Sequence, residues 1–214
     1  MYDRTRIKIC GLTTERDIEA AVRAGVDAVG FVFVKDSPRF ITPDDAADLV
    51  CMLPPFITAI GLFVDTPASA VATQAADACI EIVQLHGRES EADIEQLHTE
   101  FAIIRGVQFG SSQFQQWKSS IRIDMLLVDG SSGGQGKKFA WKSLLQEKPD
   151  LKQPLILAGG LTPQNVGDAI KIVRPFAVDV SSGVESERGK KDRALIRAFC
   201  RAVREADHHL DPSA

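Results

Sequence analysis

LILAGGLTPQNVGDAIKIVRPFAVDVSSG, residues 155–183, contains two short apolar runs separated by one amphipathic segment. The first run, 155–158, leads into two glycines, and the second, 176–181, leads into a serine and a glycine. Between them, Thr162 and Pro163 place a cap residue before a proline, which favours a helix over 164–173. Two strands joined by such a helix are expected to run parallel, so this stretch predicts a βαβ unit.

The same unit recurs along the rest of the chain. Further apolar runs rich in β-branched residues predict strands at 7–10, 28–34, 57–64, 82–86, 103–107 and 125–129. Segments with helical periodicity and a cap residue at their start lie at 15–24, 44–53, 68–76 and 91–100. Eight strands in regular alternation with helices predict an α/β fold, a single-domain (β/α)8 TIM barrel with a parallel eight-stranded barrel.

The predicted barrel domain covers 1–207, and 208–214 form a polar C-terminal tail. No composition shift or low-complexity tract divides the chain. An open doubly wound sheet is the structural alternative. Neither GxGxxG after the first strand nor GxxxxGK[ST] anywhere is present to support it.

Composition and charge exclude several classes of protein. The 214 residues are 44% hydrophobic and 25% charged, which is typical of globular proteins, and the net charge of −4 argues against a nucleic-acid partner. The longest uncharged run, 49–64, is interrupted by Pro54 and Pro55, so we expect no membrane span. The N-terminus lacks the apolar stretch of a signal peptide.

Four cysteines without a CxxC motif or a cysteine-histidine cluster argue against a disulfide framework and against a metal site. A cytoplasmic protein is therefore expected. We expect a monomer by default, with a homodimer as the alternative.

The loops after the seventh and eighth predicted strands suggest a phosphate site. In (β/α)8 enzymes the active site lies at the C-terminal ends of the strands, often with phosphate bound by these two loops. Gly159, Gly160, Ser182 and Gly183 fit that role, because small residues let backbone N–H groups approach an anion. The glycines could instead serve only tight turns. Both loops at the expected positions favour a small-molecule substrate that carries phosphate.

Cys10 and Asp129 are the candidate base and acid. Cys10 ends the first strand, and Lys8 shares its face, so a nearby ammonium is expected to lower the pKa of the thiol and favour the thiolate. The alternative for Cys10 is a small buried apolar residue. Asp129 ends the sixth strand, before a loop of small residues at 130–136 that could close over the site. The alternative for Asp129 is a loop carboxylate that accepts backbone N–H bonds.

Other strand ends supply further pocket candidates. Arg39, after the second strand, suits a carboxylate because its guanidinium can pair with it through two hydrogen bonds; a solvated loop arginine is the alternative. His86, at the end of the fourth strand, could line the pocket or be structural. Asp179 and Ser181 share one face of the eighth strand. Because the first and eighth strands are neighbours in a closed barrel, we expect Lys8 and Asp179 to pair inside it.

These residues belong to a series of motifs that covers nearly the whole chain in order. The motifs are KICGLT (8–13), GFVF (30–33), SPR (37–39), VQLHG (83–87), LVD (127–129), GGQG (133–136), FAW (139–141), LAGGL (157–161), VDVSSGVE (178–185) and GKKD (189–192). As a set they resemble the phosphoribosylanthranilate isomerase family of tryptophan biosynthesis. Two positions depart from the family pattern: no proline precedes Gly189, and Ala140 stands where aspartate is common.

The resemblance implies an Amadori rearrangement that requires no metal or cofactor. It would convert N-(5-phosphoribosyl)anthranilate to 1-(2-carboxyphenylamino)-1-deoxyribulose 5-phosphate. By the same resemblance, Asp129 is the general acid that protonates the ring oxygen and Cys10 is the general base that takes the proton from C2. Arg39 would hold the anthranilate carboxylate, and the two glycine loops would hold the phosphate.

Three alternatives are weighed against this reading. The isomerase of histidine biosynthesis has similar phosphate loops, but it would need an aspartate where Cys10 stands. Indole-glycerol-phosphate synthase would need a lysine at that position and a longer N-terminal extension. A catalytically silent barrel that only binds a phosphorylated metabolite would not need the acid and base positions, which are intact here.

Overall fold

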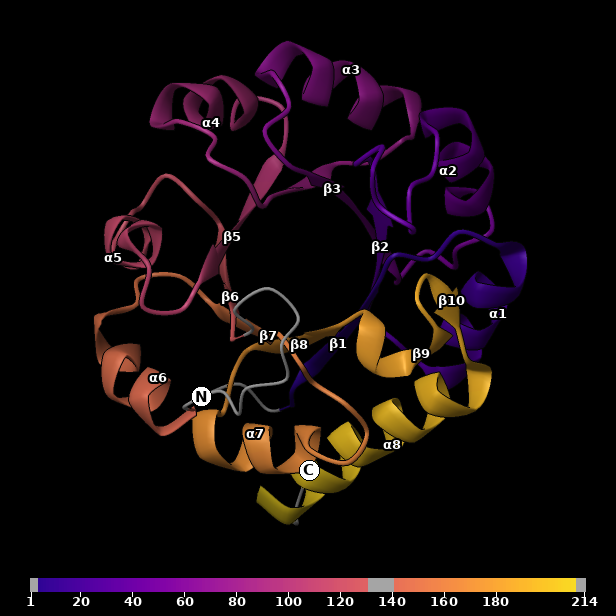
Figure 1. Cartoon of the computed structure of the whole chain (residues 1–214), viewed down its shortest axis with the longest axis vertical. Coiled ribbons are helices and arrows are strands. Elements are labelled where there is room, and N and C mark those ends of the chain that lie inside the picture. Colours follow the sequence, from indigo (N-terminus) through magenta and orange to yellow (C-terminus); the bar gives the residue numbers. More distant parts are fainter. Residues whose placement is uncertain (1–3, 131–140, 211–214) are drawn as a thin grey trace.

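The computed structural model describes residues 4–130 and 141–210, and its centre is a closed barrel. Its strands pair in parallel in chain order, and the first pairs with the last (Figure 1). The barrel strands are β1 Arg6–Cys10, β2 Ala28–Val32, β3 Thr58–Phe63, β4 Ile82–Leu85, β5 Ala102–Gln108, β6 Met125–Asp129, β7 Leu155–Ala158 and β8 Ala177–Val180. The predicted (β/α)8 barrel is therefore confirmed.

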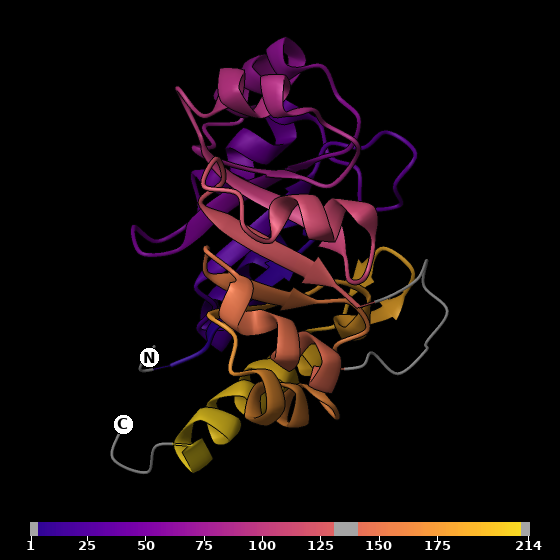
Figure 2. The same cartoon turned by 90° about the vertical axis from the view of Figure 1, so that its left-hand side faces the viewer.

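The helices lie outside the ring of strands, as the views along and across the barrel show (Figures 1 and 2). They are α1 Glu15–Ala24, α2 Pro43–Val50, α3 Ala68–Asp77, α4 Glu91–Leu97, α5 Ser112–Trp117, α6 Trp141–Glu147, α7 Val166–Val173 and α8 Arg193–Leu210. The helix faces that point toward the strands are apolar, and a large buried cluster fills the layer between helices and barrel. Burial of both sheet faces explains why the strands read as nearly continuous apolar runs.

The barrel interior has an apolar and a polar part. A second buried cluster fills the interior with side chains from different strands, namely Ile60, Ile104, Leu127, Ile156, Ala158 and Ala177. Lys8 of β1, Gln84 of β4 and Asp179 of β8 are also buried, and their side chains meet across the interior. Inward-facing side chains on β1, β4 and β8 thus form a buried polar cluster beside the apolar cluster of the barrel interior.

Several helix starts follow the chemistry that the sequence predicted. The Thr42 side chain accepts the N–H of Asp45 ahead of α2, and Ser90 and Asp93 form a reciprocal capping box at α4. The predicted helix 164–173 is shorter at its start, because the Asn165 side chain accepts the N–H of Thr162 and forms a turn there.

Some elements were not predicted. An antiparallel hairpin of β9 Glu185–Glu187 and β10 Lys190–Lys191 follows β8, after the short 3-10 helix η2 Ser182–Val184; a second 3-10 helix, η1 Lys148–Asp150, follows α6. Helix α8 packs against α1 and α7 and continues to Leu210, so 208–210 are helical where a tail was expected. The other tail residues, 211–214, lie outside the described residues. In the described ranges, no helix combines the length and apolar character needed to cross a membrane.

Candidate active site

A cavity of about 330 Å³ lies at the C-terminal ends of the barrel strands. Its lining includes nearly all the site residues predicted from the sequence, namely Cys10, Arg39, His86, Asp129, Gly159, Gly160, Asp179, Ser181, Ser182 and Gly183. Lys8 is not part of the lining, but its ammonium contacts the lining residue Asp179. The closed topology therefore brings together residues that are far apart in the sequence.

Cys10 is the last residue of β1 and is only 4% exposed. It lies opposite Gly30 of β2, where a Cβ atom would come within 2.8 Å of the Cys10 sulfur. Burial raises the pKa of the Cys10 thiol, although Lys8 and Lys191 both act to lower it. The expectation that Lys8 would lower this pKa overall was wrong, because burial outweighs the attraction and Asp179 already compensates the ammonium.

The predicted pair of Lys8 and Asp179 is confirmed. These residues are register partners on β1 and β8, and the Lys8 Nζ lies 2.9 Å from the Asp179 Oδ1. The same ammonium donates to the Gln84 Oε1, also at 2.9 Å. Although burial acts to lower the pKa of the Lys8 ammonium, the Asp179 carboxylate and the Cys10 sulfur beside it raise that pKa. The barrel interior therefore holds a fixed positive charge beside Cys10.

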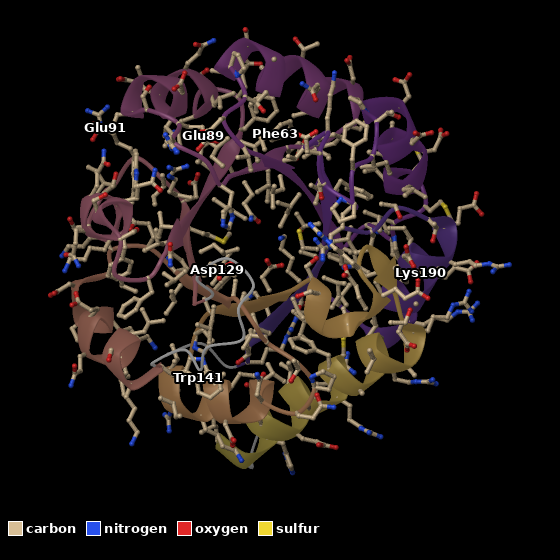
Figure 3. All side chains as sticks on the ribbon, viewed as in Figure 1. Phe63, Glu89, Glu91, Asp129, Trp141 and Lys190 are labelled. Atoms are coloured by element: carbon tan, nitrogen blue, oxygen red, sulfur yellow. The ribbon has the colours of Figure 1, made fainter. Side chains whose placement is uncertain are left out.

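Asp129 ends β6 and lies at the inner edge of the barrel, whereas Phe63 packs on the outer side of β3 (Figure 3). The next residue, Gly130, donates its N–H to the Ala158 carbonyl and so keeps the strand end beside β7. Asp129 lines the same cavity as Cys10. The predicted covering loop at 130–136 lies outside the described residues from 131 onward.

The two loops predicted to bind phosphate are in contact with each other. Gly159 and Gly160 adopt positive φ angles of 85° and 66°, which favour glycine. At Gly183 a Cβ atom would lie only 1.8 Å from the carbonyl oxygen of Leu161. The loop after β8 can therefore come this close to the loop after β7 only with glycine at position 183. The glycines thus serve tight backbone geometry and also line the cavity.

Arg39 is held by a partner that the sequence did not reveal. Its Nε and Nη2 atoms donate to the two carboxylate oxygens of Glu185, at 2.7 and 2.8 Å. Glu185 also accepts from the Lys191 Nζ at 2.7 Å and from the N–H of Gly189. These donors hold the pKa of Glu185 down at about 2, despite the burial of its side chain. Lys191 donates in turn to the Ser181 carbonyl and hydroxyl oxygens.

This cluster connects two parts of the predicted site. The β9–β10 hairpin supplies Glu185 and Lys191, and these residues join the loop that carries Arg39 to the end of β8. Burial and the nearby Arg39 charge lower the pKa of Lys191, whereas Glu185 acts to raise it. Neither residue was predicted to be a site residue, because the hairpin was not predicted.

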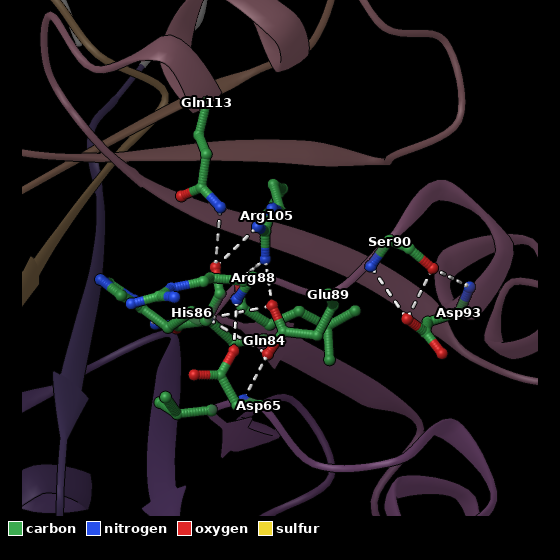
Figure 4. Close-up of polar contacts among 12 residues, drawn as sticks. Asp65, Gln84, His86, Arg88, Glu89, Ser90, Asp93, Arg105 and Gln113 are labelled. Atoms are coloured by element: carbon green, nitrogen blue, oxygen red, sulfur yellow. Dashed lines mark hydrogen bonds and ion pairs between the residues drawn. The ribbon is translucent and has the colours of Figure 1, made fainter.

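The β4 side of the site is fixed by another buried ion pair. Arg105 of β5 bonds Glu89 and the carbonyl oxygens of Leu85 and Gly87, and it is fully buried (Figure 4). This pair anchors the loop that follows His86. His86 lines both the main cavity and an adjoining cavity of about 440 Å³, and burial lowers the pKa of its imidazole. Among the described residues, no three His, Cys, Asp or Glu side chains are grouped to hold a metal ion.

With its cavity at the end of the barrel where (β/α)8 enzymes carry out their chemistry, the chain belongs to the (β/α)8-barrel class of enzymes. The profile of the N-(5'-phosphoribosyl)anthranilate (PRA) isomerase family matches residues 7–202. The chain therefore belongs to this family of aldose-ketose isomerases, which act in tryptophan biosynthesis.

Similar proteins support this assignment. The N-(5'-phosphoribosyl)anthranilate isomerase of Methylibium petroleiphilum is 47% identical over 216 residues, which cover 98% of this chain and 99% of that protein. The crystal structure of the phosphoribosyl anthranilate isomerase from Thermotoga maritima aligns with a TM-score of 0.88 at 37% identity, over 94% of this chain and 99% of that chain. A further isomerase structure, a complex with reduced 1-(o-carboxyphenylamino)-1-deoxyribulose 5-phosphate, aligns with a TM-score of 0.85 at 36% identity and the same coverage.

Proposed function

We propose that this isomerase rearranges N-(5'-phosphoribosyl)anthranilate with Asp129 as general acid and Cys10 as general base. The observation that carries the proposal is the convergence of both side chains on one cavity, together with Arg39 and the two glycine loops. A similar isomerase has been crystallised with a reduced ligand that carries a carboxylate and a phosphate. A cationic group and an anion-binding loop in one cavity match the two charged ends of such a ligand.

Two proton transfers convert the substrate to an enolamine, and a tautomerisation then gives the product, which has the same atoms as the substrate. Asp129 gives a proton to the ribose ring oxygen, the bond from that oxygen to C1 breaks, and a protonated Schiff base forms between C1 and the anthranilate nitrogen. Cys10 then takes the proton from C2, and the bonding electrons form the C1–C2 double bond of an enolamine. In the tautomerisation O2 loses its proton and C1 gains one, which gives the ketose product. Exchange with solvent removes the proton that Cys10 took from C2 and returns a proton to Asp129, so both groups regain their starting states.

The positive charge of the intermediate assists the base. Burial disfavours the Cys10 thiolate in the empty site, as the raised pKa of the thiol indicates. A Schiff-base cation beside the sulfur adds a third positive charge to those of Lys8 and Lys191, and it also makes the C2 proton more acidic. The thiolate is therefore stabilised most at the step that uses it.

Arg39 retains hydrogen-bond donors for a substrate. A guanidinium has five N–H donors, and Glu185 takes only one from the Nε and one from the Nη2. Within residues 4–130 and 141–210, the donors of Nη1 and the second donor of Nη2 have no other acceptor, so a carboxylate can accept from them. We propose that Arg39 holds the anthranilate carboxylate through these donors, while Gly159, Gly160, Ser182 and Gly183 hold the phosphate.

The test compares turnover with ligand binding in two variants. We expect Cys10→Ala and Asp129→Asn each to lose about 10² to 10⁴ in kcat, the usual contribution of a general acid or base. Binding of the reduced product analogue, measured by calorimetry, should be largely retained in both. Cys51→Ala, which removes an exposed cysteine, is the matched control and should keep wild-type turnover. Near-native kcat in either active-site variant would refute the role assigned to that residue.

The same experiment distinguishes the alternatives. A silent binding barrel would bind the analogue and show no turnover in the wild type. Turnover of the histidine-pathway substrate alone would favour that isomerase.

We also propose a cytoplasmic location, supported by four unpaired cysteines, of which Cys51 and Cys79 are exposed. A monomer stays the expectation for the oligomeric state, and light scattering of the purified protein tests it against a homodimer.

A further inference from the structure

The buried Gln84 side chain contacts two other residues of the site, the Lys8 ammonium and the His86 imidazole. Gln84 is 1% exposed and lies on β4. Its Oε1 lies 2.9 Å from the Lys8 ammonium, and its Nε2 lies 3.1 Å from the His86 Nδ1. Gln84 and His86 lie beside each other on the same strand end (Figure 4). Gln84 takes no part in the two proton transfers of the proposed reaction.

The chemistry of Lys8 determines which way the Gln84 amide faces. An ammonium group has only donors, so the atom that faces it must be the amide oxygen. The orientation of the Lys8 ammonium is itself fixed by Asp179, at 2.9 Å. With the oxygen of Gln84 facing Lys8, the amide NH₂ faces His86.

The amide orientation in turn determines the proton position on His86. An NH₂ group only donates, so the His86 Nδ1 accepts the hydrogen bond and carries no proton. The proton of the neutral ring is then on Nε2. Burial lowers the pKa of His86, an effect that Lys8 and Arg105 strengthen and that Asp129 and Asp179 oppose. The ring is therefore neutral near pH 7 and has one donor, at Nε2.

The backbone beneath His86 is shaped to hold the ring in this place. A Cβ atom on Gly106 of β5 would lie 2.3 Å from the His86 Nδ1, so the ring can occupy its position only over a glycine. His86 lines the main cavity together with Asp129 and Cys10. With Nδ1 held by Gln84, the Nε2–H is the polar group that the ring can offer to a ligand.

We propose that Gln84 is a positioning residue that transmits the fixed orientation of the Lys8 ammonium to His86, so that His86 stays in the Nε2–H tautomer and donates a hydrogen bond to a sugar oxygen of the substrate. The donation to substrate rests on the proposed function. The tautomer does not, because Lys8, Gln84 and His86 determine it in the empty enzyme.

The first test is the tautomer of the wild-type enzyme. ¹⁵N NMR distinguishes a protonated from an unprotonated ring nitrogen, and the His86→Asn variant identifies the His86 signals among the four histidines of the chain. We expect an unprotonated Nδ1 and a protonated Nε2 near pH 7. A protonated Nδ1, or an even mixture of the two tautomers, would overturn the proposal.

The second test reverses the polarity of residue 84. In Gln84→Glu a carboxylate accepts from Lys8 and also requires a donor at the His86 Nδ1, so we expect the proton to appear on Nδ1. We expect kcat to fall about tenfold, which corresponds to the loss of one hydrogen bond of about 1.4 kcal/mol. Gln115→Glu makes the same change at an exposed position of α5 and should alter neither the tautomer nor kcat. An unchanged tautomer in Gln84→Glu would contradict the proposal.

Another variant at residue 84 covers the case in which Gln84→Glu does not fold. Gln84→Met has a similar shape but no hydrogen-bonding amide, so we expect a mixture of tautomers and a smaller loss of kcat than in Gln84→Glu. A single Nε2–H tautomer in Gln84→Met would contradict the role of Gln84. If the wild type shows the expected tautomer but no turnover of phosphoribosylanthranilate, the proposed function fails while the tautomer assignment stands.

Discussion

The Glu185 carboxylate offers a direct test of how the β9–β10 hairpin holds the site. Its side chain is 3% exposed and bonds both Arg39 and Lys191. Its pKa is lowered from 4.5 to about 2. At about 1.36 kcal/mol for each pKa unit, this shift corresponds to roughly 3 kcal/mol of folding free energy when the group is ionised.

The pH dependence of this contribution has a definite sign. Because the pKa in the folded state is below that of the unfolded chain, the stabilisation is complete above about pH 4.5 and is lost as the pH falls toward about 2. Near pH 3 about one pKa unit of the shift remains, which corresponds to about 1 kcal/mol. The neutral Glu185→Gln variant lacks this contribution at every pH.

We therefore expect Glu185→Gln to be less stable than the wild type by about 3 kcal/mol near pH 7 and by about 1 kcal/mol near pH 3. Urea unfolding followed by far-ultraviolet circular dichroism measures both differences, and the contributions of titrating groups that do not contact residue 185 cancel between the two proteins. Because Glu185 orients Arg39, kcat/KM should also fall, mainly through KM. A stability difference that does not change with pH, or one below about 1 kcal/mol near pH 7, would show that the ionised Glu185 does not stabilise the fold through these contacts.

Three further predictions test separate parts of the structure. Gly183→Ala would place a methyl group against the Leu161 carbonyl oxygen and force the two loops apart. The affinity for inorganic phosphate, measured by calorimetry, should therefore fall about tenfold or more. Unchanged affinity would exclude a phosphate role for this contact. Arg105→Met leaves a buried carboxylate unpaired and should cost about 3–5 kcal/mol in urea unfolding, with kcat of the folded enzyme largely kept. Lys8→Met should destabilise by a similar amount, about 3–5 kcal/mol, and adding Asp179→Asn should restore part of this loss, whereas additive losses would mean that the two residues do not act as a pair.

The part of the structure that repeats was predictable from the sequence. Parallel strands that are buried on both faces leave apolar runs, and their regular alternation with capped helices specifies the closed barrel. Closure makes β1 and β8 neighbours, and a side-chain period of two places Lys8 and Asp179 on the inner face. Their ion pair therefore followed from topology alone.

The remaining features depend on contacts that have no local pattern. Glu185 and Arg39 are separated by 146 positions in the sequence. They meet only because the irregular β9–β10 hairpin packs against the loop that follows β2. The buried Arg105 could not be distinguished by sequence from an exposed arginine, since its carboxylate partner lies in another loop. The predicted direction of the Cys10 pKa shift was wrong. The actual direction depends on the balance between burial and two nearby ammonium groups, which only the packed structure determines.

Isomerase activity with Cys10 as the base is tested by a coupled assay on the purified protein. Phosphoribosylanthranilate is generated in place, EDTA is present throughout, and the decay of the anthranilate-type fluorescence is followed for the wild type and for Cys10→Ala. We expect rapid decay with the wild type and a rate lower by about 10² to 10⁴ with the variant. Equal rates for the two proteins, or a wild-type rate that does not exceed the uncatalysed background, would contradict this expectation.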